Sequence, residues 1–170
     1  KNGLAANGVT ALVEDGAGHL WVGTNRGLSR SDTRGFVSWT RDDGLIDDSI
    51  LELLVDSGGH LWVGTADGLS RYDGHQFTHF TIDASLDANT VTALWEDSSG
   101  NLWIGFQDSG LRQWAGVGKD CCEKKNIIGF NTEDGLPHSN VNELWEDSTG
   151  GLWVGTGDGL SRYNGAYFIR

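Results

Sequence analysis

The chain has 170 residues, of which 26 are glycine and one is proline, and its formal net charge is −12. Eight tryptophans give it large apolar side chains for a sizeable core. The acidic balance argues against nucleic acid or an anionic membrane surface as a partner, because phosphate binding needs a basic surface. No apolar run approaches the roughly 20 residues of a membrane helix, so we expect no membrane insertion in this chain. It begins at Lys1 without a methionine, and we expect a processed or excised piece.

Four copies of one motif run through the sequence, and their tryptophans are spaced 41, 41 and 50 residues apart. The copies are Leu20-Trp21-Val22-Gly23, Leu61-Trp62-Val63-Gly64, Leu102-Trp103-Ile104-Gly105 and Leu152-Trp153-Val154-Gly155. Each is preceded by a short apolar segment that ends in aspartate, and each is followed by a Gly-Leu pair and a further apolar patch. Four short strands separated by turn residues, in a unit of this length, are typical of a β-propeller blade.

We therefore expect an all-β fold, a β-propeller built from four four-stranded antiparallel blades. The blades cover approximately residues 1–40, 41–81, 82–131 and 132–170, and the whole of 1–170 is a single propeller module. We label the expected strands of each blade A to D, from the inner to the outer edge. The expected A strands are residues 9–15, 50–56, 91–97 and 141–147, and the expected D strands are 36–39, 77–80, 127–130 and 167–169.

The A–B turn of each repeat begins with an aspartate and contains glycine. The aspartates are Asp15, Asp56, Asp97 and Asp147. Their carboxylates can accept hydrogen bonds from turn amides, and glycine can adopt a positive φ. Four copies at one repeat position favour this turn chemistry over a calcium loop, and we expect no metal site. The repeated tryptophans are expected in the core between sheets, with the glycine of the motif leaving room for a bulky neighbour.

The loops fall at two ends of the expected propeller, with the D–A and B–C loops at one end and the A–B and C–D loops at the other. The B–C loops differ between repeats, so binding specificity is expected at their end. The candidate binding residues are Asn25, Arg26, Asp67, Gln107, Asp108, His138 and Asp158. The asparagine or aspartate just before each A strand is expected to serve as a turn or capping group.

The third repeat is nine residues longer than the first two, and the extra length falls between Trp114 and Ile127. It contains three lysines and the adjacent pair Cys121 and Cys122. Adjacent cysteines rarely bond to each other, and two thiols fall short of a tetrahedral zinc site. We expect exposed loop thiols, in a segment that is either a contact loop or a neutral insertion.

Residues 96–105 and 158–163 closely resemble the two-component regulator propeller repeat, and residues 133–141 look like its opening segment. The resemblance covers nearly the whole chain four times. It implies blades of the kind that usually build seven-bladed propellers, in the extracytoplasmic (periplasmic) sensor half of hybrid histidine kinases and related signalling proteins. Some of these proteins respond to oligosaccharides. The departures are Ser31 at a tyrosine position, Ala84-Ser85 at an Asp-Gly position and the long third C–D turn.

The resemblance implies a non-catalytic propeller that senses a ligand or contacts a protein. The expected partner is an oligosaccharide or small molecule, with no cofactor, and the family offers no catalytic residues to carry over. Two alternatives stay open: a lyase-like enzyme, because streptogramin lyase resembles this architecture, and a lectin-like binder with one site per blade. A catalytic acid–base group would have to stand apart from the repeat. Of the five histidines only His138 lies near the favoured loop end, and it has no visible partner triad.

Closure of the ring is a separate question. Four-bladed rings are tight, and an open arc of four blades would expose the apolar faces of its two end blades. We expect self-association as a head-to-tail homodimer that completes an eight-bladed ring. A closed four-bladed monomer is the alternative.

Overall fold

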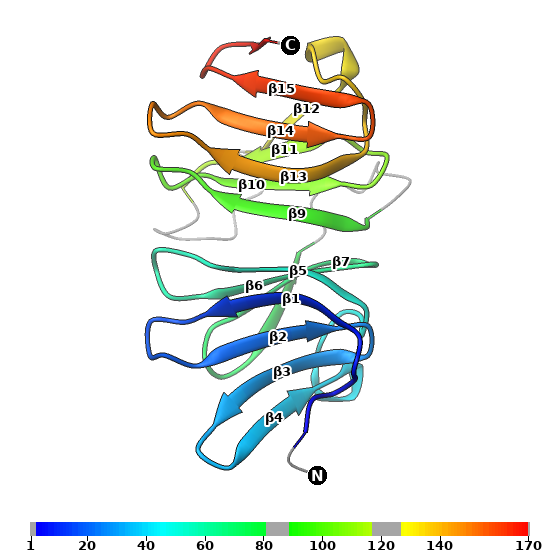
Figure 1. Cartoon of the computed structure of the whole chain (residues 1–170), viewed down its shortest axis with the longest axis vertical. Helices are drawn as coiled ribbons and strands as arrows, with labels where there is room; N and C mark the ends of the chain where they lie inside the picture. The colour runs from blue at the N-terminus through cyan, green and yellow to red at the C-terminus, as the bar shows by residue number, and fades with distance from the viewer. Residues whose placement is uncertain (1–2, 81–88, 117–126, 170) are drawn as a thin grey trace. The chain divides into compact units, whose positions relative to one another are not determined.

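A computed structural model describes residues 3–80, 89–116 and 127–169. In this part of the chain the strands form four antiparallel sheets of four strands each, and neighbours in every sheet follow one another in sequence (Figure 1). Two short 3-10 helices, η1 (Arg41–Asp43) and η3 (Thr132–Asp134), precede the second and fourth sheets. The predicted all-β propeller blades are confirmed. No helix among the described residues has the length and apolar character needed to cross a membrane.

We call the four sheets blades 1 to 4. Blade 1 contains β1 (Val9–Glu14), β2 (Leu20–Thr24), β3 (Gly27–Asp32) and β4 (Gly35–Trp39). Blade 2 contains β5 (Ile50–Val55), β6 (Leu61–Thr65), β7 (Gly68–Tyr72) and β8 (Phe77–Phe80). Blade 3 contains β9 (Val91–Glu96), β10 (Leu102–Phe106), β11 (Leu111–Trp114) and β12 (Ile127–Phe130). Blade 4 contains β13 (Val141–Glu146), β14 (Leu152–Thr156), β15 (Gly159–Tyr163) and β16 (Phe168–Ile169).

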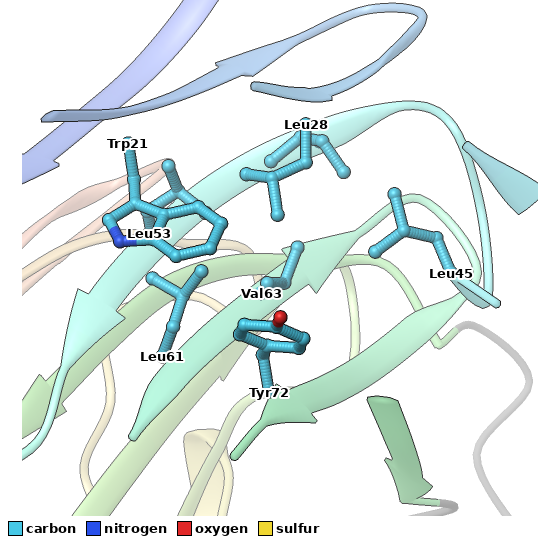
Figure 2. Close-up of a cluster of buried hydrophobic side chains, with 8 residues drawn as sticks. Trp21, Leu28, Leu45, Leu53, Leu61, Val63 and Tyr72 are labelled. Carbon is cyan, nitrogen blue, oxygen red and sulfur yellow. The ribbon is translucent and has the colours of Figure 1, made fainter. Parts of the chain in front are cut away.

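The chain divides into two compact units, Lys1–Thr81 with blades 1 and 2 and Ile82–Arg170 with blades 3 and 4. In the first unit one face of blade 1 packs on blade 2 through a buried cluster (Figure 2) of Trp21, Leu28, Leu45, Ile50, Leu53, Leu61, Val63 and Tyr72. In the second unit blades 3 and 4 share the cluster of Ala93, Trp103, Leu111, Leu136, Val141, Leu144, Leu152 and Val154. Each fully buried large side chain contributes about 1.5–3 kcal/mol, so these clusters dominate the packing.

We call the face of a blade that meets the following blade its leading face, and the opposite face its trailing face. The glycine of the repeated motif lies on the leading face and makes room for the next blade. A Cβ added to Gly23 would lie 2.6 Å from Cγ2 of Ile50, and one added to Gly105 would lie 2.5 Å from Cγ1 of Val141. The β-branched residue that opens the next blade therefore occupies the space left by the glycine, as the sequence predicts.

Replacing Gly105 with alanine should destabilise the second unit by about 1–3 kcal/mol, because the added methyl group overpacks the contact with Val141. Urea unfolding measures this loss. Gly16→Ala is the matched control, since a Cβ at Gly16 meets nothing within 4 Å. Equal stability of the two variants would contradict the close fit.

Two apolar blade faces remain exposed. On the trailing face of blade 1, Val9 and Leu12 are 46% and 60% exposed, although the equivalent Ile50 and Leu53 of blade 2 are buried. On the leading face of blade 4, Leu160 is 54% exposed, although the equivalent Leu28 and Leu111 are buried. A Cβ on Gly155 would approach only Glu143 of its own blade. Blade 1 thus presents an exposed β-branched side chain, and blade 4 presents an unfilled space at its glycine.

We expect these two faces to bury each other between two copies of the chain, head to tail, so that an eight-bladed ring forms. Light scattering should then give the mass of two chains. Leu12→Asp and Leu160→Asp should each yield a monomer, because a charge on an apolar interface is costly. Val37→Asp, which alters an exposed side chain on β4, should leave the dimer intact. A stable monomer of the unaltered chain would rule out this assembly.

Candidate functional site

In the first unit the predicted binding residues lie in two B–C turns, the β2–β3 turn with Asn25 and Arg26 and the β6–β7 turn with Asp67. All three side chains are exposed. The D–A loop between β4 and β5 accepts backbone hydrogen bonds from both turns. The Gly27 N–H donates to the carbonyl of Asp48 at 2.7 Å, and the Ala66 N–H donates to the carbonyl of Ser49 at 3.1 Å. The loop thereby gathers the candidates of blades 1 and 2 at the same end of this unit.

The second unit has the same arrangement, with the exposed candidates Gln107, Asp108, His138 and Asp158. The carbonyl of Ser139 accepts from the Gly110 N–H at 2.7 Å, and the carbonyl of Asn140 accepts from the Gly157 N–H at 2.9 Å. Nδ1 of His138 accepts the Asn140 N–H at 2.9 Å, which fixes the ring beside the β14–β15 turn. Among the described residues no hydrogen bond or ion pair joins one candidate side chain to another, so they form an open polar surface.

The opposite end of each blade is organised by its A–B turn. An indole N–H donates to the aspartate carboxylate of the turn at 2.8–2.9 Å in the pairs Trp21–Asp15, Trp62–Asp56, Trp103–Asp97 and Trp153–Asp147. The carboxylates also accept backbone N–H groups of their own turns. The predicted structural role of these aspartates is confirmed. Within the described ranges no group of three or more His, Cys, Asp or Glu side chains could hold a metal ion.

In three blades an arginine of strand C covers the tryptophan ring. The Cζ atoms of Arg30, Arg71 and Arg162 lie 5.3, 5.6 and 5.9 Å from the ring centroids of Trp21, Trp62 and Trp153. Each arginine is the cross-strand partner of its tryptophan. In blade 3 the partner of Trp103 is Gln113. Among the described residues of blade 3, no cation lies over this ring.

In blade 4 the guanidinium of this arginine lies at a different place than in blades 1 and 2. Gly151 stands where the A–B turns of blades 1 and 2 have His19 and His60. A Cβ there would collide with the guanidinium of Arg162. The guanidinium instead takes the place of those side chains, and its Nε donates to Oδ2 of Asp147 at 2.7 Å.

A groove of about 450 Å³ lies between blades 3 and 4, where Gln113 replaces the arginine. Its walls include Asp97, Asn101, Trp103 and Gln113 from blade 3, and Glu146 and Tyr163 from blade 4. Two carboxylates line it, and no lysine, arginine or histidine is among its described lining residues. Sequence reasoning missed this groove. No local pattern signals it, because Arg112 follows Trp103 at the same spacing as the arginines of the other three repeats follow their tryptophans.

In blades 1 and 4 the hydrogen bonds of the A–B turn lower the pKa of its aspartate. Burial alone would raise the pKa of Asp15, but the backbone N–H of His19, the indole of Trp21 and the backbone N–H of Ala17 outweigh it and lower the pKa to about 2. In blade 4 the hydrogen bond from Arg162 is the largest cause that holds the pKa of Asp147 well below its ordinary value. The same contact raises the pKa of Arg162. The turns of blades 1 and 4 therefore favour ionised Asp15 and Asp147.

Residues 3–26 and 44–67 match the sequence pattern of the two-component regulator propeller. These two stretches of the chain are therefore two-component regulator propeller repeats. Both matched stretches run from the D–A loop through strands A and B, and they include the pairs Asp15–Trp21 and Asp56–Trp62. The aspartate–tryptophan contact is therefore part of the repeat itself, as are the turns that hold Asn25 and Asp67.

The fold is similar to the extracellular domains of two proteins from B. thetaiotaomicron that are assigned as hybrid two-component systems. The first has a TM-score of 0.80 and 21% identity over 95% of this chain and 22% of its own. The second has a TM-score of 0.81 and 22% identity over 96% of this chain and 25% of its own. Virginiamycin B lyase from Staphylococcus aureus has a TM-score of 0.70 and 15% identity, over 95% of this chain and 54% of its own.

At these identities the likeness establishes the fold alone. The chain spans about a quarter of the length of the two extracellular domains. No curated protein matches the sequence.

The low pKa of Asp15 has a consequence for stability in acid. Its folded pKa of about 2 lies below its ordinary value of 3.8, so its contribution is present above pH 3.8 and is lost as pH falls through about 2. Urea unfolding between pH 5 and pH 2 should show a smaller loss of stability in Asp15→Asn than in the unaltered chain. Asp42→Asn, in the exposed helix η1, is the control. Equal losses in all three proteins would contradict this assignment.

Proposed function

We propose that this chain is a non-catalytic ligand-sensing or protein-interaction part of an extracytoplasmic signalling receptor. The observation that carries the proposal is that the repeated residues and the variable residues have different places in the blade. The repeated aspartates, tryptophans and glycines serve the scaffold, and the side chains that vary between repeats are exposed at the D–A and B–C end. The extracellular setting of the two similar domains supports the location.

The hydrogen bonding of the histidines supports a binding role over a catalytic one. Nδ1 of His19 and of His60 lies within 3.2 Å of the aspartate in its own A–B turn. Nδ1 of His79 bonds to Ser70 at 2.9 Å, and Nδ1 of His138 accepts a backbone N–H. These side chains are engaged in turns and strand pairs. A general acid or base needs a substrate proton within hydrogen-bond reach, whereas the described hydrogen bonds of these four histidines stay within their own blades.

The loop-end residues of the second unit favour a polar ligand that touches blades 3 and 4. Amide, imidazole and carboxylate side chains, such as Gln107, His138 and Asp158, donate and accept hydrogen bonds as hydroxyl-rich ligands require. The side chains differ from blade to blade, which favours one asymmetric ligand over a separate copy in each blade. An oligosaccharide fits both properties. Oligosaccharides are therefore the class of ligand that we propose for the loop end.

Melting temperature tests the proposal, because a ligand that binds only the folded state raises it. We expect at least one member of a panel of linear glucose, xylose, mannose and galactose oligosaccharides to raise the melting temperature. Gln107→Ala or Asp158→Ala should abolish the rise, since each removes loop-end hydrogen bonds of the second unit. Gln76→Ala, an exposed change in the β7–β8 turn, should preserve it. No rise with any sugar, or a rise that both loop-end variants retain, would contradict an oligosaccharide site here.

A further inference from the structure

We propose that Glu14, on the trailing face of blade 1, binds the A–B turn of blade 4 in a second copy of this chain and thereby selects the head-to-tail partner. Apolar burial supplies the driving force for pairing these faces, but it is non-directional and does not by itself choose between them. The polar contacts between the blades of one unit show which groups meet when a leading face packs on a trailing face. The proposal does not depend on the ligand proposed for the loop end.

The interface between blades 3 and 4 supplies the template. Glu146 ends β13 and lies two residues after the buried Leu144, so its side chain shares the trailing face of blade 4. The backbone N–H of Ser98, in the A–B turn of blade 3, donates to Oε2 of Glu146 at 2.7 Å. The hydroxyl of Ser98 donates to Oε1 of the same carboxylate. One glutamate therefore binds two donors of the neighbouring blade.

Both halves of this contact are present on the two exposed faces. Glu14 directly precedes the turn aspartate of blade 1, as Glu146 does in blade 4, and Glu14 is exposed. Ser148 directly follows the turn aspartate of blade 4, as Ser98 does in blade 3, and Ser148 is also exposed. When the leading face of blade 4 meets the trailing face of blade 1 in a second copy, Ser148 and Glu14 take the places of Ser98 and Glu146.

The blade fold does not require this contact. Between blades 1 and 2 the equivalent positions hold Gly16 and Val55, and Val55 packs beside the apolar cluster of the first unit. Gly16 has no hydroxyl group and the side chain of Val55 has no acceptor, so this interface forms without the contact. The serine and the glutamate of the two exposed faces therefore add a polar contact that blades 1 and 2 do without.

The A–B turn of blade 4 is suited to an incoming carboxylate. Nε of Arg162 donates to Oδ2 of Asp147 at 2.7 Å, and Nη2 of Arg162 donates to the hydroxyl of Thr149 at 2.7 Å. The guanidinium thus lies within the turn that contains Ser148, and its charge offsets that of Asp147. The carboxylate of Glu14 therefore approaches a turn whose charges are balanced, with a cation beside the donors of Ser148.

A second polar contact lies at the loop end of the same interface. In the first unit the N–H of Gly27 in blade 1 donates to the carbonyl of Asp48, in the loop before blade 2, at 2.7 Å. The equivalent groups of the exposed faces are the N–H of Gly159 in blade 4 and the carbonyl of Asn7 before β1. The carbonyl of Asn7 accepts the N–H of Val9 at 3.1 Å, and the carbonyl of Asp48 likewise accepts the N–H two residues on at 3.1 Å. The two loops therefore present their carbonyls in the same way.

These contacts distinguish head-to-tail pairing from pairing of two like faces. The leading face of blade 4 offers donors, which are the N–H and hydroxyl of Ser148 and the N–H of Gly159. The trailing face of blade 1 offers acceptors, which are the carboxylate of Glu14 and the carbonyl of Asn7. Two trailing faces would bring two carboxylates together, and two leading faces would leave their donors unpaired. Only a leading face on a trailing face pairs each donor with an acceptor.

The self-association constant of the full chain, from light scattering over a dilution series, tests the contact. Glu14→Lys should weaken association about tenfold, because it removes a charge-assisted hydrogen bond and brings a cation toward Arg162. Ser148→Glu should weaken it in the same way, because its carboxylate meets that of Glu14. Asp42→Lys is the matched control, since it makes the same change of charge as Glu14→Lys at an exposed position of η1.

A mixture of the two variants gives the sharper test. In a head-to-tail pair of one Glu14→Lys chain and one Ser148→Glu chain, one interface joins the introduced cation to the introduced carboxylate. The other interface keeps the original Glu14 and Ser148. The equimolar mixture should therefore associate at least as tightly as the unaltered chain, although each variant alone associates weakly. Recovery in the mixture also shows that both variants are folded.

Three results would overturn the proposal. These are association of Glu14→Lys as tight as that of the unaltered chain, an equal loss of association in Asp42→Lys, and an equimolar mixture that associates no more tightly than the separate variants. Pairing of like faces predicts the last result, because such pairs never bring position 14 of one chain to position 148 of the other.

Discussion

The hydrogen bond from a tryptophan indole to the aspartate of the A–B turn is the contact on which each blade depends. In blades 1 and 3 the tryptophan ring lies between neighbouring sheets, where an indole N–H without a partner would cost free energy. The aspartate satisfies it and also ties the amides of its own turn, so one carboxylate sets both the turn and the ring orientation. Ring orientation then determines what can lie over it, whether the arginine of strand C or the aromatic side chain of the next blade.

The strands and turns could be predicted from the sequence because their signals are local. The Leu-Trp-Val-Gly motif, the aspartate six residues before each tryptophan and the following Gly-Leu pair all lie within one hairpin, and β1, β2 and their equivalents form as predicted. The candidate loop residues could also be predicted from the sequence, since variation between repeats can be seen without a structure. Their grouping by the Asp48–Ser49 and Ser139–Asn140 loops depends on backbone contacts that no residue pattern specifies.

The groove could not be predicted because it depends on strand register and on a distant residue. Blade 3 has one extra residue between its tryptophan and strand C, so Arg112 pairs with Ile104 and donates to the carbonyls of Ser109 and Leu111. A reader of the sequence sees an arginine in about the right place and counts the position as filled. Only the register shows that Gln113 faces Trp103 instead. Glu146 comes from the following blade, and no local pattern connects it to Gln113.

The fit of a β-branched side chain into a glycine notch also bears on how such proteins change length. Gly23 receives Ile50, and Gly105 receives Val141, through the same geometry in both units. A contact that is the same at successive interfaces does not record which blade precedes which. Duplicating or deleting a whole repeat would then preserve every fit, whereas a partial repeat would leave a notch facing the wrong strand. Families built on this contact should gain and lose blades one at a time. The ends of each duplicated or deleted segment should fall at the same position of the repeat.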